Sequence, residues 1–95
     1  MANFELLKEL TQAWGVAGRE KAVRAIVLRE LEGHVDSAYV DNIGNIIAVK
    51  HGKGSPDSKK IMLSAHMDEI GLQVKKIESD GRIKVCSVGW VWTSA

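Results

Sequence analysis

The N-terminal part of the chain carries apolar residues at helical spacing. The apolar positions that recur every three or four residues are Phe4, Leu7, Leu10 and Trp14. They predict an amphipathic helix over about Asn3–Ala13, with Asn3 as its N-cap. After glycines at positions 15 and 18 the pattern resumes, and it predicts a second helix over about Arg19–Glu32 that Gly33 terminates.

Beyond the second predicted helix the pattern changes to that of strands. Ser37–Val40 and Ile46–Val49 flank the turn-rich stretch Asp41–Asn45, and together they predict a hairpin. The polar segment over residues 51–60 holds the chain's one proline and is typical of a surface loop. Ile61–Ala65 is nearly all apolar, which predicts a short strand buried on both faces.

Two further strands are predicted in the C-terminal part. Ile70–Ile77 and the alternating segment Arg82–Val88 are joined by a tight turn at residues 79–81. Cys86 lies in the second of these strands, where we expect it to be a small buried hydrophobe. The whole pattern predicts an α/β fold.

Large apolar side chains gather at the end of the sequence. Two of the three tryptophans, Trp90 and Trp92, fall in its last six residues. This cluster predicts either a truncated chain or a surface meant for a partner. We expect all of the tryptophans, Trp14 included, to be core or interface groups.

Composition narrows the class of protein. The 95 residues include 13 Lys and Arg against 12 Asp and Glu, so there is no basic footprint for nucleic acid or for an anionic membrane. The single cysteine cannot form an internal disulfide. The opening residues lack the uninterrupted apolar run of a signal peptide, and no run is long enough to span a bilayer. A cytoplasmic protein is expected.

The chemistry is concentrated in Ser64–Gly71, which reads SAHMDEIG. In an extended chain residues i and i+2 share one face, so His66 and Asp68 can meet. A carboxylate beside an imidazole fixes its tautomer, as it does for many metal-ligating histidines. Spacing alone leaves open a surface histidine with an incidental carboxylate neighbour, and one histidine cannot hold zinc by itself.

Read with its surroundings, AHMDEIG resembles the dinuclear-metal aminopeptidases that assemble into tetrahedral particles. Members of that family are called glutamyl or deblocking aminopeptidases, and some are called endoglucanases. Trp14 and Ala17 depart from the family pattern, which often has proline and serine there. The other segments that resemble the family follow in the family's order: Leu6–Thr11, Gly15–Glu20, Val40–Asn45, Ser79–Gly81 and Ser87–Gly89.

The resemblance implies roles for particular residues. His66 would ligate one of two divalent metal ions, zinc or cobalt, Asp68 would orient His66, and Glu69 would brace the loop. Residues 1–70 would be the N-terminal part of a catalytic domain, and residues 71–95 the incomplete beginning of an inserted β-rich dimerisation domain. The chain therefore looks like a fragment.

The implied function is that of a metal-dependent aminopeptidase, a homo-oligomer that removes N-terminal residues from peptides. The other metal ligands and the general base are not among these residues, so we expect the 95-residue chain to be inactive alone. Two alternatives stay open. One is a non-catalytic assembly or regulatory module derived from the family. The other is an endoglucanase, whose chemistry needs two carboxylates across a sugar.

Overall fold

Two short helices form the N-terminal end of the structure, a computed structural model that describes residues 3–92. Helix α1 spans Phe4–Gln12 and helix α2 spans Lys21–Leu31, each slightly shorter than predicted. The Asn3 side chain accepts a hydrogen bond from the Leu6 N–H at 3.1 Å, which confirms the predicted N-cap. Gly33 follows α2 with a φ of 75°, as a helix-terminating glycine should.

The core is small and lies on α2. Val23 and Ile26 are the buried hydrophobic side chains among the described residues, at 7% and 8% exposure. The two helices are also joined by Arg29, whose guanidinium donates to both carboxylate oxygens of Glu9 at 2.8 and 2.7 Å. Most of the apolar face predicted for α1 remains exposed because few described residues cover it.

The tryptophans are not core residues in this structure. Trp14, Trp90 and Trp92 expose 82%, 95% and 83% of their surface, so the core half of that prediction is wrong. The reason is physical: a core position needs packed neighbours on all sides, and the described elements supply none there. Their role at an interface stays a prediction. Residues 93–95 of the C-terminal stretch lie outside the described residues.

The predicted first hairpin is confirmed. Strand β1, Ser37–Val40, pairs antiparallel with strand β2, Ile46–Val49. Asp41 organises the turn, since its Oδ1 accepts the backbone N–H groups of Ile43 and Asn45 at 3.0 and 2.8 Å. Arg24 of α2 donates to the Gly44 carbonyl and so attaches the hairpin to the helix.

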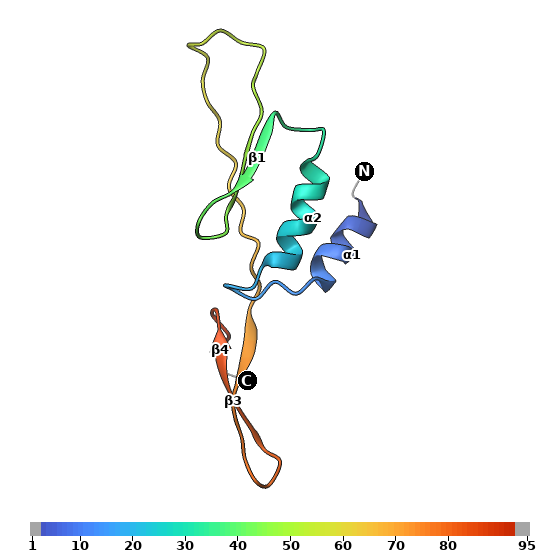
Figure 1. The fold of residues 1–95 in the computed structure, drawn as a ribbon, viewed down its shortest axis with the longest axis vertical. Coiled ribbons are helices and arrows are strands. Elements are labelled where there is room, and N and C mark those ends of the chain that lie inside the picture. Colours follow the sequence, from blue (N-terminus) through green and yellow to red (C-terminus); the bar gives the residue numbers. More distant parts are fainter. Residues whose placement is uncertain (1–2, 93–95) are drawn as a thin grey trace.

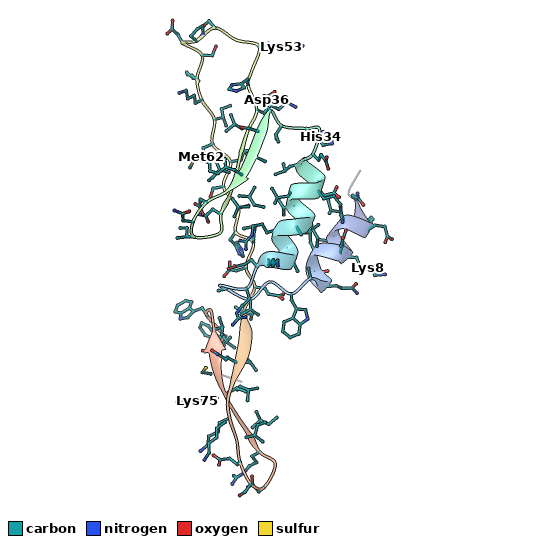
Figure 2. All side chains as sticks on the ribbon, in the orientation of Figure 1. Lys8, His34, Asp36, Lys53, Met62 and Lys75 are labelled. Atoms are coloured by element: carbon teal, nitrogen blue, oxygen red, sulfur yellow. The ribbon has the colours of Figure 1, made fainter. Side chains whose placement is uncertain are left out.

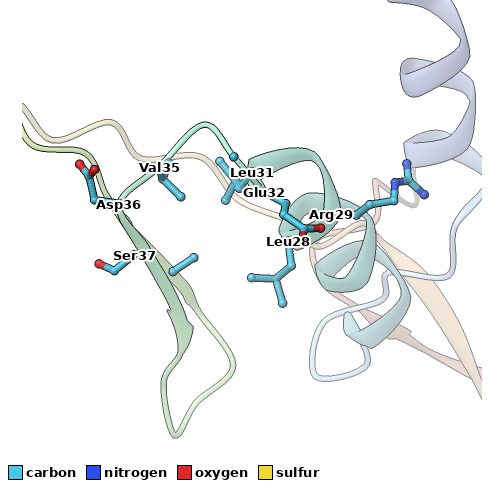
Figure 3. A pocket seen from close by; sticks show the side chains of 9 residues that line it. Leu28, Arg29, Leu31, Glu32, Val35, Asp36 and Ser37 are labelled. Atoms are coloured by element: carbon cyan, nitrogen blue, oxygen red, sulfur yellow. The ribbon is translucent and has the colours of Figure 1, made fainter.

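A shallow hollow of about 410 Å³ separates the last turn of α2 from β1 (Figure 3). Leu28, Leu31 and Val35 supply its apolar lining. Arg29 points out of this space toward α1, consistent with its pairing to Glu9 (Figure 3).

The predicted buried strand at Ile61–Ala65 is wrong. Ile61, Met62 and Leu63 are 87%, 88% and 92% exposed, and the segment around Met62 is coil (Figure 2). A sheet strand needs neighbours for its N–H and C=O groups. Within the described range, β1 and β2 pair only with each other, so no ladder reaches this segment.

The second predicted hairpin is confirmed. Strand β3, Gly71–Ile77, pairs antiparallel with strand β4, Ile83–Val88, around a turn in which Gly81 has a φ of 86°. The prediction of a buried Cys86 is wrong, because its thiol is exposed on this two-stranded ribbon. No other strand of residues 3–92 joins this ribbon, and the Cys86 Sγ lies 3.7 Å from the Gln73 carbonyl oxygen.

The polar loop of residues 51–60 and the β3–β4 hairpin lie at opposite ends of an elongated molecule, and the first hairpin lies beside α2 (Figure 1). Its extents are 67 × 27 × 26 Å and its radius of gyration is 18.5 Å. A compact domain of similar length would have a radius of gyration of about 13 Å. Two helices and four strands in two small sheets confirm the α/β class. Among the described helices, none has the length and apolar character to cross a membrane.

Candidate metal site

The predicted site lies where the extended coil passes the loop between the two helices and enters β3 (Figure 1). At this point Val16 and Glu69 form an isolated parallel bridge, and the Glu69 N–H donates to the Gly15 carbonyl at 2.8 Å. The Glu69 side chain is exposed, so this residue braces the segment through its backbone. The bridge holds residues 66–69 against the loop between the two helices.

The structure brings His66 and Asp68 together. The His66 Nδ1 lies 2.9 Å from the Asp68 Oδ1 and 3.0 Å from the Asp68 carbonyl oxygen. The i, i+2 spacing is sufficient for this contact even though the segment belongs to no strand. Both partners of Nδ1 are acceptors, so Nδ1 carries a proton, and in the neutral ring Nε2 then keeps its lone pair.

The remaining ring nitrogen of His66 is open to a ligand. The His66 side chain is 86% exposed and that of Asp68 is 41% exposed. An imidazole whose Nδ1–H is held by a carboxylate presents Nε2 as a metal ligand of fixed orientation. This is the arrangement that the sequence predicted for the pair, and its use by a metal remains a prediction.

A hollow of about 320 Å³ adjoins the pair. One wall is formed by His66–Glu69, and the opposite wall by Leu10 and Thr11 of α1 together with Val23 and Val27 of α2. The wall that faces the site from the helices is therefore mostly apolar.

The donors present fit part of a metal site. Across residues 3–92, no group of three or more His, Cys, Asp or Glu side chains is placed to hold a metal ion. Zinc takes at least three protein ligands in catalytic sites, so His66 can supply one of them and Asp68 its orienting partner. His34 and His51 are exposed and do not join His66 in a group that could hold a metal ion.

Sequence reasoning missed one residue of this region. The sequence indicates Gly15 as a break after the first helix and as part of a family-like turn, but the glycine is also buried and accepts the hydrogen bond from Glu69. The available signal was its place in the GVAGRE stretch that carried the family resemblance. Nothing in that stretch indicates which distant segment would lie against the glycine.

Comparison with known proteins defines the class. Residues 44–95 match the M42 glutamyl aminopeptidase family, and residues 2–26 match a second family described as AMPT. A putative aminopeptidase of Acetivibrio thermocellus is 47% identical over 93% of this chain and 26% of its own length. The chain belongs to the M42 glutamyl aminopeptidase family.

Two solved structures share the fold. An aminopeptidase from the archaeon Desulfurococcus kamchatkensis matches with a TM-score of 0.81 and 43% identity, over 93% of this chain and 24% of that one. A protein named an endoglucanase from Thermotoga maritima matches with a TM-score of 0.76 and 49% identity, over 90% of this chain and 27% of that one. The chain thus spans about a quarter of the length of these relatives.

Proposed function

We propose that this chain contributes to a metal-dependent aminopeptidase that removes N-terminal residues from peptides. The observation that carries the proposal is the contact between the His66 Nδ1 and the Asp68 Oδ1 at 2.9 Å, which leaves Nε2 exposed in a chain of this family. In this proposal His66 ligates one of two divalent metal ions, zinc or cobalt. Asp68 does not bind the metal and instead orients His66.

The residues of this chain at the proposed site have limited tasks in the reaction. Bound divalent metals polarise a scissile carbonyl and lower the pKa of a water molecule. Asp68 holds the His66 ring in one orientation, so Nε2 needs no ring flip before it binds. Val23 and Val27 line the apolar side of the hollow next to the pair. The general base and the further metal ligands must be supplied by residues other than these.

The proposal also covers the domain organisation of the chain. Residues 1–70 contribute to the catalytic domain, and residues 71–95 begin a β-rich domain used for dimerisation in a homo-oligomer. The confirmed β3–β4 ribbon, with its exposed apolar side chains Leu72, Val74 and Ile77, is compatible with such a role. Glycoside hydrolysis has less support, because Asp68 faces a histidine and not a second carboxylate across a space for a sugar.

Zinc titration of the 95-residue chain, followed by the ¹⁵N resonances of its three histidines, tests the proposal. We expect the His66 Nε2 resonance to respond at lower zinc concentration than those of His34 and His51. Asp68→Ala should weaken zinc binding at His66 by about tenfold, the lower end of what such orienting partners contribute.

Asp57→Ala is the matched control, because Asp57 lies in the exposed loop and should leave His66 unchanged. Equal responses of all three histidines, or an Asp68→Ala chain with undiminished affinity, would contradict the proposal and favour the non-catalytic module. We also expect the 95-residue chain alone to release no nitroaniline from aminoacyl-nitroanilides with zinc or cobalt added.

A further inference from the structure

Gly15 occupies a place where no side chain fits. It is buried, and a Cβ added there would lie 2.7 Å from the Val23 Cγ2 and 3.4 Å from the Met67 carbonyl oxygen. Its φ is outside the left-handed region, so space and not backbone conformation is what requires glycine. The loop between the helices can approach both α2 and the 66–69 segment only because this side chain is missing.

The backbone around Gly15 also holds the segment that carries His66 and Asp68. The Gly15 carbonyl accepts the Glu69 N–H at 2.8 Å, and Val16 pairs with Glu69. Two residues after Glu69, a Cβ on Gly71 would lie 2.6 Å from the Val16 Cγ2, so the two segments are closely packed there as well.

These contacts fall on both sides of Asp68. Met67 and Glu69 both lie against Gly15, and planar peptide units connect them to the Asp68 Cα. The backbone position of Asp68 sets both acceptors of the His66 Nδ1, the carboxylate at 2.9 Å and the carbonyl at 3.0 Å. Hydrogen bonds weaken steeply with small losses of alignment.

We propose that Gly15 is a positioning residue for the His66–Asp68 pair, acting through the backbone of Met67–Glu69. This inference rests on the proposed function only in one assumption, that the oriented imidazole of His66 binds a metal ion. Gly15 touches no metal and no substrate in this scheme. It fixes where Asp68 stands, and Asp68 fixes the ring of His66.

Gly15→Ala in the 95-residue chain tests the inference, with two readouts at His66. In metal-free protein, ¹⁵N spectra should show the Nδ1–H tautomer losing its dominance. In the zinc titration, the dissociation constant at His66 should rise by about tenfold, as it does when an orienting partner is disturbed. Gly52→Ala is the control, because the nearest heavy atom to a Cβ there lies 4.0 Å away.

A folded Gly15→Ala chain with an unchanged His66 tautomer would overturn the inference, as would an equal change in Gly52→Ala. If Gly15→Ala fails to fold, an ester in place of the Glu69 peptide N–H removes the same hydrogen bond and adds no atom to the contact. A shifted tautomer in the ester variant supports the inference, and an unshifted one rejects it. The tautomer is read without metal, so absence of zinc binding would refute the proposed function separately.

Discussion

Asn3 accepts the Leu6 N–H at the start of α1, where the first backbone donors of a helix have no partner within it. Replacing this residue by alanine should lower the free energy of unfolding by about 1 kcal/mol, the usual contribution of an N-cap. Urea unfolding followed by far-UV circular dichroism measures the change.

Asn42→Ala is the control for the cap, because the Asn42 side chain makes no hydrogen bond to another described residue. Equal losses in both variants would mean that the Asn3 hydrogen bond contributes nothing beyond the general effect of replacing an asparagine.

At this scale, prediction from the sequence succeeds where the cause is local. The cap at Asn3, the end of α2 at Gly33 and the contact between His66 and Asp68 all involve residues close in the chain. The burial of Gly15 was not predictable in the same way. It depends on Val23 and on Met67, and the latter is distant in sequence.

At the scale of elements, Glu78 joins the two strands of the second hairpin. Its carboxylate lies 2.7 Å from the Nζ of Lys76 and 2.7 Å from the Nζ of Lys84. These hydrogen bonds hold the pKa of Glu78 below its ordinary value of 4.5. A depressed pKa means that the contribution of this group to stability is complete above the unfolded pKa and is lost as the pH falls through the lower folded value.

We therefore expect the β3–β4 hairpin to loosen as the pH falls below about 4.5. In Glu78→Gln this part of the pH dependence should shrink, because the titrating group is gone. Thermal unfolding followed by the methyl resonances of Val74 and Val85 at a series of pH values measures the effect. Glu32→Gln, outside the hairpin, should keep the original pH profile, and a Glu78→Gln profile that matches it would reject this expectation.

The two hairpins were predictable because each strand's partner follows it directly in the chain. The segment Ile61–Ala65 was predicted as a buried strand from its apolar composition, and it is exposed coil. Apolar composition indicates that a segment is suited to a buried strand if a sheet is there to receive it. It does not report which other segments are present to form that sheet, and β1 and β2 do not extend to it.

At the scale of the molecule, stability depends on a small core. Ile26 is 8% exposed, and shortening it to valine should lower the free energy of unfolding by about 1 kcal/mol. Ile43→Val removes the same methylene from a side chain that is 86% exposed, so it should change stability little. Urea midpoints of the two variants decide the comparison, and equal shifts would mean that α2 does not form the core.

The bridge between Val16 and Glu69 closes a long loop that contains α2, the first hairpin and the polar segment of residues 51–60. The entropic free-energy cost of closing a flexible loop rises only with the logarithm of its length, by about 0.6 kcal/mol for each doubling. Extra residues inserted among positions 51–60 would thus raise the closure cost by a small fraction of that. This segment can therefore tolerate changes in length at little cost in stability while the bridge keeps His66 and Asp68 in place.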